Sequence, residues 1–236
     1  MEDIMTKPII ALDFNTFDEV QKFLSQFDES LYVKVGMELY MLEGRNVIKE
    51  LRAMGHDLFL DLKLHDIPNT VARTMAGLGK LDVQMVNVHA RGGSEMMRRA
   101  NLAFKEHNPE GICIAVTELT STNEIMVKNE LRSEISLEES VLNLAALTKE
   151  AGLDGVVSSP LESPLIHEKI GEDFVTVTPG IRLNENRNDD QVRIVTPEHA
   201  RELGSNYIVV GRPITQSHNP VEAYHHIKSL WEGYNE

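Results

Sequence analysis

Eight short runs rich in β-branched and other apolar residues recur along the sequence, and stretches with the hydrophobic periodicity of helices separate them. Short apolar runs of this kind are typical of strands that are buried on both faces of a parallel sheet. The runs are Pro8–Asp13, Leu31–Gly36, Asp57–Lys63, Gln84–His89, Ile112–Thr117, Leu153–Ser158, Phe174–Thr178 and Tyr207–Gly211. Eight strand–helix alternations without a linker, repeat array or low-complexity tract predict one closed (β/α)8 TIM barrel over residues 1–236. A doubly wound open sheet is the alternative.

The chain also carries local signals for the start of several helices. A Ser or Thr followed three residues later by Glu forms a capping box, and an N-cap residue followed by proline also begins a helix. These signals are Thr16 with Glu19, Ser136 with Glu139, Thr196 with Pro197, and Asn219 with Pro220. Four of the expected helices therefore have a defined first turn.

The composition argues against several classes of function. Of the 236 residues, 42% are apolar and 25% are charged, and no apolar run approaches the ~20 residues that span a bilayer. We expect no membrane segment. The first residues include Glu2 and Asp3 but no basic stretch, so they do not resemble a secretory signal, and we expect a cytoplasmic protein. The formal net charge of −14 argues against nucleic-acid partners and anionic membranes. Cys113, the single cysteine, lies in an apolar run, which predicts a buried structural thiol.

The segment Phe59–Thr70, FLDLKLHDIPNT, sorts its charged and apolar residues by face. The period of two in a strand places Asp61 and Lys63 on one face and the leucines between them on the other. In LYVKVG, Lys34 alternates with valines in the same way. Because burying ammonium groups is costly without nearby carboxylates, we interpret Lys34, Asp61, Lys63 and Asp66 as an alternating Lys-Asp-Lys-Asp array. The alternative is a solvated strand end whose surface ion pairs contribute little.

A barrel of this type places its functional residues at the carboxyl ends of the strands. Polar residues do close the expected strands, whereas a doubly wound sheet would gather its site at one switch point. They are Asp13, Lys34, Asp61, Lys63, His89, Thr117, Thr178, Arg182, Gly211 and Arg212. Among possible acid–base residues, we interpret His65 as a rim residue and His89 as a hydrogen-bonded structural histidine.

The loops after the seventh and eighth strands predict a phosphate site. These loops are the habitual phosphate site of the fold, where glycine admits backbone N–H groups and arginine supplies a bidentate clamp. They read TPGIR, which ends at Arg182, and VVGRPIT, which contains Gly211 and Arg212. The polar stretch Leu183–Arg193 has too few apolar residues to pack, so it predicts either a solvated loop or a mobile lid, and we favour the lid because it joins the two phosphate loops.

Together these segments resemble the orotidine 5′-monophosphate decarboxylases of the bacterial type over essentially the whole chain. No departure is apparent at a position that the family uses. The matching segments are ALDF with Asp13, YVKVG with Lys34, DLKLHDIPNT at 61–70, VNVHA with His89, TELTST with Thr120, TVTPGIR with Arg182, NDDQVR with Gln191, and IVVGR with Gly211 and Arg212.

The resemblance implies conversion of orotidine 5′-monophosphate to UMP and CO2 in de novo pyrimidine biosynthesis, without a metal or other cofactor. It implies that Lys63 is the proton donor of the array. It also implies a homodimer in which Asp66 and Thr70 belong to the neighbouring subunit's site. The implied substrate contacts are Asp13 and Lys34 to the ribose hydroxyls, Thr120 to the pyrimidine, Gln191 between lid, phosphate and base, and Arg182, Gly211 and Arg212 to the phosphate.

Two other functions compete with this interpretation. Sugar-phosphate decarboxylases and aldol-type synthases of the same fold group share the Asp-x-Lys-x-x-Asp motif and resemble enzymes that use a divalent metal, but Lys34, Thr120 and Gln191 suit a nucleotide. A non-catalytic phosphate-binding barrel is the third possibility. It would be expected to have lost Lys63 or Asp61, and this chain has kept both.

Overall fold

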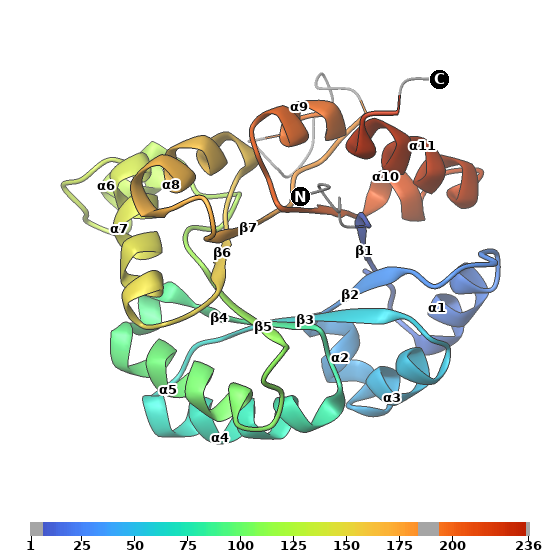
Figure 1. The fold of residues 1–236 in the computed structure, drawn as a ribbon, viewed down its shortest axis with the longest axis horizontal. Coiled ribbons are helices and arrows are strands. Elements are labelled where there is room, and N and C mark those ends of the chain that lie inside the picture. The colour runs from blue at the N-terminus through green and yellow to red at the C-terminus, as the bar shows by residue number, and fades with distance from the viewer. Residues whose placement is uncertain (1–6, 184–193, 235–236) are drawn as a thin grey trace.

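The computed structural model, which describes residues 7–183 and 194–234, contains a closed barrel of eight parallel strands (Figure 1). The strands are β1 (Ile9–Ala11), β2 (Tyr32–Gly36), β3 (Asp57–Leu64), β4 (Met85–His89), β5 (Ile112–Val116), β6 (Gly155–Val157), β7 (Val175–Thr178) and β8 (Tyr207–Val210). Each strand pairs with the next, and β1 also pairs with β8. This closure confirms the predicted TIM barrel and excludes the doubly wound alternative, whose sheet would have two open edges.

Helices surround the ring of strands on the outside (Figure 1). They are α1 (Phe17–Leu24), α2 (Met37–Glu43), α3 (Asn46–Ala53), α4 (Pro68–Leu78), α5 (Ser94–Lys105), α6 (Glu124–Asn129), α7 (Leu137–Glu150), α8 (Ser163–Ile170), α9 (Pro197–Glu202), α10 (Arg212–Thr215) and α11 (Pro220–Glu232), with short 3₁₀ helices η1 (Gly79–Leu81), η2 (Ala90–Gly92) and η3 (Pro160–Glu162).

All four predicted helix starts are confirmed. Both capping boxes form: each N-cap hydroxyl accepts a bond from the amide of the Glu three residues later, whose carboxylate returns one to the N-cap amide. The side chains of Thr196 and Asn219 accept amide bonds from the first turns of α9 and α11. These contacts satisfy amides that have no partner inside the helix.

Side chains that alternate along the strands form two apolar layers. The inner layer fills the barrel and includes Tyr32 of β2 and Phe59 of β3. The outer layer lies between strands and helices and includes Val33, Val35 and Leu60. Charged residues with the inward parity of Tyr32 and Phe59 must therefore point into the barrel, as the sequence period predicted.

The predicted positions of the polar residues at the strand ends need one correction. Lys34 lies in the middle of β2 rather than at its end, because pairing with β3 continues to Gly36, opposite Asp61. Asp13 and Gly211 lie just beyond their strands at the same barrel end, and Arg212 is the first residue of α10.

Two expectations from composition concern Cys113 and membrane segments. Cys113 is fully buried in β5, and its burial raises the pKa of the thiol, which confirms the structural interpretation. Within residues 7–183 and 194–234, the structure contains no helix with the length and apolar character to cross a membrane. The cytoplasmic location stays a prediction.

Candidate active site

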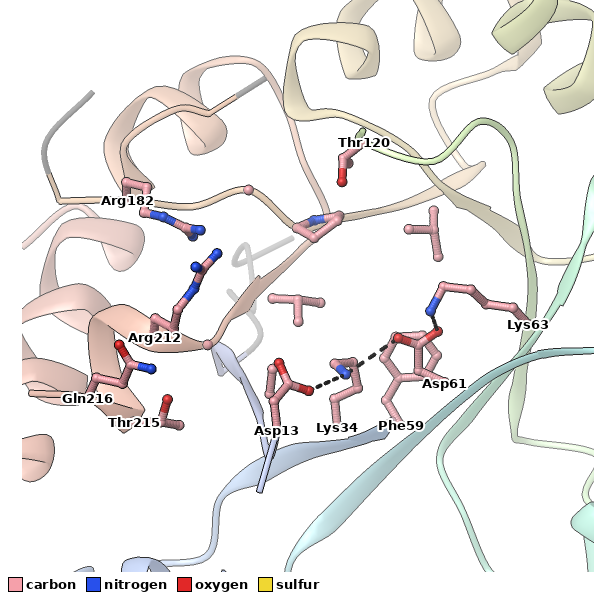
Figure 2. A pocket seen from close by; sticks show the side chains of 16 residues that line it. Asp13, Lys34, Phe59, Asp61, Lys63, Thr120, Arg182, Arg212, Thr215 and Gln216 are labelled. Atoms are coloured by element: carbon pink, nitrogen blue, oxygen red, sulfur yellow. Dashed lines mark hydrogen bonds and ion pairs between the residues drawn. The ribbon is translucent and has the colours of Figure 1, made fainter. Parts of the chain in front are cut away.

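A pocket of about 420 Å³ opens at the carboxyl end of the barrel (Figure 2). It is lined by residues of β1, β2, β3, β6 and β8, by the segments that follow β1, β5, β7 and β8, and by α10. The predicted site residues that line it are Asp13, Lys34, Asp61, Lys63, Thr120, Arg182, Gly211 and Arg212. Residues far apart in the sequence thus meet at the end of the barrel where this fold places its active sites.

Lys34 on β2 and Asp61 and Lys63 on β3 form, together with Asp13, a row of side chains with alternating charge on one side of the pocket (Figure 2). The ammonium group of Lys34 lies 3.2 Å from Oδ1 of Asp13 and 3.5 Å from Oδ2 of Asp61. Nζ of Lys63 lies 2.6 Å from Oδ1 of Asp61. The Asp61 carboxylate is therefore held between two ammonium groups in a largely buried position, where ionic contacts are screened less than at the surface.

This surrounding keeps the Asp61 carboxyl group ionised. Burial alone would raise its pKa, because a charge is poorly solvated inside the barrel. Lys34 and Lys63, with hydrogen bonds from Lys63 and Asn87, outweigh burial and hold the pKa of Asp61 below its ordinary value. The site therefore carries a fixed negative charge beside two positive ones, one of them on the more exposed side chain of Lys63.

Asn87 is a residue of this site that the sequence analysis missed. Its side chain, 1% exposed, donates a 2.6 Å bond from Nδ2 to Oδ1 of Asp61 and accepts a 2.8 Å bond at Oδ1 from the Lys63 amide. The signal in the sequence was an asparagine with inward parity in the apolar run MVNVH of β4. A buried polar side chain in such a strand needs partners, and here both are residues of the charged row.

The side of the pocket away from Lys63 carries two guanidinium groups, those of Arg182 and Arg212 (Figure 2). Arg182 follows Gly180, whose φ of +87° is one that glycine adopts without strain. The Arg182 amide donates a 2.9 Å bond to the Val195 carbonyl, and the Val195 amide donates one of 3.1 Å to the Gly180 carbonyl. The backbone on both sides of residues 184–193 is thus tied together next to the arginines.

The loop after β5, which carries Thr120 into the pocket, is anchored by a buried ionic cluster. The Glu118 carboxylate, 4% exposed, accepts hydrogen bonds from the Arg91 guanidinium and, at 2.6 Å, from the Ser140 hydroxyl on α7. Breaking a buried pair of this kind leaves an uncompensated charge, so the cluster resists movement of the loop. Sequence analysis did not identify Glu118 or Arg91, because nothing local to either residue indicates that they meet.

The chain matches one protein family along almost its whole length. The model of the orotidine 5'-phosphate decarboxylase / HUMPS family matches residues 6–227. The chain belongs to this family. Proteins named orotidine 5'-phosphate decarboxylase from Staphylococcus haemolyticus and Staphylococcus aureus are 58% and 59% identical to it, over 96% and 95% of this chain and 98% and 97% of theirs. The protein is accordingly a decarboxylase, an enzyme of the carboxy-lyase class.

Solved structures support the family membership. The crystal structure of orotidine 5'-phosphate decarboxylase from Lactobacillus acidophilus has 42% identity and a TM-score of 0.86, covering 95% of this chain and 98% of that one. An uncharacterized conserved protein from Geobacillus kaustophilus has 45% identity and a TM-score of 0.85, covering 94% and 99%. The barrel described above is therefore shared by members of the family whose structures have been solved.

Two residues that the family resemblance assigned to the site, Asp66 and Thr70, do not line the pocket of this single chain. Asp66 is exposed in the loop after β3, where its Oδ1 accepts a 2.6 Å bond from the Ile67 amide. Thr70 lies in the first turn of α4. Neither lines the pocket. Gln191, and all of the expected lid apart from Leu183, lie outside the described residues.

The two candidate acid–base histidines also lie outside the pocket lining. Their rings stack at 5.6 Å between centroids, with His65 exposed and His89 half-buried. Burial, and after it the charge of His65, lower the pKa of His89, whose Nδ1 accepts a bond from the Arg91 amide. These contacts confirm that His65 is a rim residue and that His89 is hydrogen-bonded.

The arrangement of the acidic, cysteine and histidine side chains bears on whether this protein could bind a metal ion. In the part of the chain that the structure describes, no three His, Cys, Asp or Glu side chains are grouped to hold a metal ion. The carboxylate best placed in the pocket, that of Asp61, already binds Lys34 and Lys63. Independence from metal remains a prediction for experiment.

Proposed function

We propose that this protein is an orotidine 5′-monophosphate decarboxylase, which converts orotidine 5′-monophosphate to UMP and CO2 in de novo pyrimidine biosynthesis. The observation that carries the proposal is the Asp61 carboxylate held between Lys34 and Lys63 in one pocket with the Arg182 and Arg212 guanidinium groups. This arrangement suits an anionic nucleotide whose phosphate binds at one end and whose base binds at the other.

Lys63 is proposed as the group that stabilises the reacting carbon and then protonates it. When the bond between C6 and the carboxylate breaks, CO2 leaves and the electron pair remains on C6 as a carbanion with little resonance relief. A fixed ammonium group beside C6 stabilises that charge more than it stabilises the substrate. The proton then passes from Nζ of Lys63 to C6, and the neutral amine regains a proton from solvent.

Asp61 is proposed to hold the two lysines in place and to lie beside the substrate's carboxylate. Its lowered pKa keeps Asp61 charged, so its carboxylate attracts the Lys63 side chain and holds it in the pocket. The same negative charge repels a substrate carboxylate bound next to it, and that repulsion is relieved when CO2 leaves. Lys34 contacts the other carboxylate oxygen of Asp61, Oδ2, and balances part of its negative charge.

Binding at the far end of the substrate is proposed to help the chemistry at C6. Arg182, Arg212 and the Gly211 backbone, which line this end of the pocket, would bind the phosphate. Binding energy from a remote phosphate can be used to desolvate and orient the reacting carbon.

The remaining contacts follow from where each side chain lies. Asp13 and Lys34 are proposed to bind the ribose hydroxyls, because their ion pair lies between the arginines and the Lys63 end (Figure 2). Thr120 is proposed to bind the pyrimidine from the anchored loop after β5. Gln191 lies outside the described residues, and the family resemblance alone supports the proposal that it links the lid, the phosphate and the base.

A homodimer with shared active sites is part of this proposal. Asp66 does not line its own pocket, and the apolar side chain that follows it, Ile67, is 67% exposed. On α2, which follows β2, the strand that pairs with β3, the side chains of Met37 and Met41 are 59% and 72% exposed. Apolar side chains exposed in this way favour a protein interface, across which Asp66 and Thr70 would enter the partner's site.

A metal-dependent sugar-phosphate decarboxylase or aldol-type synthase has less support from the same geometry. It would need an acidic ligand at the pocket, yet both oxygens of Asp61 contact donors: Lys63 and Asn87 at Oδ1 and Lys34 at Oδ2. A metal would have to displace two ammonium groups from this carboxylate.

The test is an ultraviolet assay with orotidine 5′-monophosphate before and after exhaustive chelation. We expect the orotidylate absorbance to fall on addition of the enzyme, at the same rate in both samples. Activity that disappears with chelator and returns with magnesium would favour the sugar-phosphate alternative. No decarboxylation in either sample would contradict the proposed function.

A further inference from the structure

Strand β3 contains an irregularity directly beside the charged row. Leu60 pairs with Val86 and Leu64 pairs with Val88, so three residues of β3 stand opposite the single residue Asn87 of β4. The extra length is a β-bulge, which interrupts the backbone ladder at Asp61 to Lys63. The segment that carries the reactive charges is thus held less by regular sheet pairing than the strands around it.

The backbone of Lys63 adopts an unusual conformation within this bulge. Its φ of +50° lies in the left-handed region, which a lysine enters only at an energetic cost. This conformation sets the direction of the Lys63 side chain, whose Nζ lies 2.6 Å from Asp61. Something outside the regular ladder must hold the backbone there, and the contact that the structure provides is the 2.8 Å bond from the Lys63 amide to Oδ1 of Asn87.

The orientation of the Asn87 amide is determined by its two partners. The Lys63 N–H can only donate and the ionised Asp61 carboxylate can only accept, so the Asn87 oxygen faces Lys63 and its nitrogen faces Asp61. At 1% exposure, the side chain has little access to water as a substitute partner. The Asn87 amide therefore holds both the Asp61 carboxylate and the backbone of Lys63, the proposed proton donor.

We infer that Asn87 is a positioning residue for decarboxylation, which holds the β3 bulge and the Asp61 carboxylate so that Lys63 points at the reacting carbon. It contacts Asp61 and Lys63 but does not line the pocket, so it acts through these two residues rather than on the nucleotide itself. The chemical step should therefore depend on it much more than nucleotide binding does. The kinetic part of this inference rests on the proposed function.

Replacing Asn87 by aspartate keeps the oxygen that accepts a hydrogen bond and changes the group that donates one. In Asn87→Asp an oxygen still accepts from the Lys63 amide. When the new carboxyl is protonated, its O–H can donate to Asp61 as Nδ2 does in the wild type. When it is ionised, two carboxylates face each other at the 2.6 Å contact and repel. Because like charges raise the pKa of such a pair, the proton is lost at a higher pH than for an isolated carboxyl.

Other groups that titrate or carry charge near this contact act on both proteins. The pKa of His89, two residues beyond Asn87, is lowered by burial and then by His65. Because His89 is present in both proteins, the ratio of the variant's kcat to the wild-type kcat removes the effect of His89. Lys34 on β2 and Lys63 on β3 contact the Asp61 carboxylate, and Asp13 beyond β1 contacts Lys34. The charged and titratable groups around His89 are His65, Lys63, Arg91 beyond β4 and Glu118 beyond β5.

The experiment compares Asn87→Asp with the wild type from pH 5.5 to pH 9. We expect the ratio of kcat values to fall at least tenfold as the pH rises, while the Kd for UMP at low pH stays within threefold of the wild-type value. Asn206→Asp is the matched control, because Oδ1 of Asn206 also accepts a bond, of 2.7 Å, from a strand amide, that of Thr176, away from the pocket lining. A constant ratio for Asn87→Asp, or the same fall for Asn206→Asp, would overturn the inference.

A measurement on the wild type covers the case in which the Asn87 variant does not fold. The Lys63 amide should exchange with deuterium at least about a hundredfold more slowly than an unstructured peptide does, because it is hydrogen-bonded to Asn87. Exchange as fast as at the exposed residue Asn69 would show that the contact is not maintained and would refute the inference. This measurement needs no substrate, so it remains decisive even if the wild type fails to decarboxylate orotidine 5′-monophosphate.

Discussion

The ammonium group of Lys63 lies 2.6 Å from the carboxylate of Asp61, two residues earlier on the same strand. The pair places the proposed proton donor and an opposite charge side by side on one short segment of β3. Both side chains line the pocket, and Lys63 is the more exposed of the two.

Lys63→Ala should therefore lower kcat on the order of 10³-fold or more, since a positioned general acid and a stabilising charge are lost together. The variant should remain folded by circular dichroism. Lys105→Ala is the control, because that lysine pairs with Asp154 outside the pocket lining, at 2.9 Å, and its loss should leave kcat within threefold. A folded Lys63→Ala protein with a tenth of wild-type turnover would contradict the assignment.

Asp61 should make the stability of the fold depend on pH under acidic conditions. Its pKa is lower in the folded state than in the unfolded chain, where an aspartate has a pKa of about 3.9. Its stabilising contribution is therefore complete above that value and is lost as the pH falls through the folded-state pKa. Asp61→Asn should reduce the slope of unfolding free energy against pH below about pH 4, as measured by urea denaturation. Identical slopes for both proteins would show that Asp61 is not held ionised.

Arg212→Ala should separate phosphate binding from chemistry. The loss of a hydrogen bond to a charged group costs about 1.5–3 kcal/mol, so kcat/KM for the nucleotide should fall roughly 10- to 150-fold. Turnover of the free nucleoside orotidine, which has no phosphate, should barely change. Equal losses on both substrates would indicate a structural role for Arg212.

Subunit mixing tests whether Asp66 serves the partner's site. Lys63→Ala and Asp66→Ala proteins should each be inactive, whereas a hybrid dimer would contain one site with both residues intact. Random exchange makes about half of the dimers hybrids with one good site of two, so roughly a quarter of wild-type activity should return. If subunit exchange is confirmed by mass spectrometry and no activity returns, Asp66 acts within its own chain.

The barrel and the general position of its site could be predicted from the sequence because both depend on local patterns. Eight apolar runs alternating with helices, and the strand period of two at Lys34, Asp61 and Lys63, are properties of neighbouring residues. Glycine and arginine after the last strands indicated the phosphate end in the same way. The exact bounds of strands were less predictable, and Lys34 lies inside β2 because pairing with β3 continues beyond it.

The tertiary structure alone decided how the charged row is held. Asn87 lies opposite Asp61 and Lys63 only because the register of β3 against β4 shifts between Leu60 and Leu64. Likewise, Glu118 meets Arg91 and Ser140 only when β4, β5 and α7 pack together. Such contacts join residues 22 to 27 positions apart. A local pattern carries no information about them, because the register that brings these side chains together is set by the closure and packing of the whole barrel.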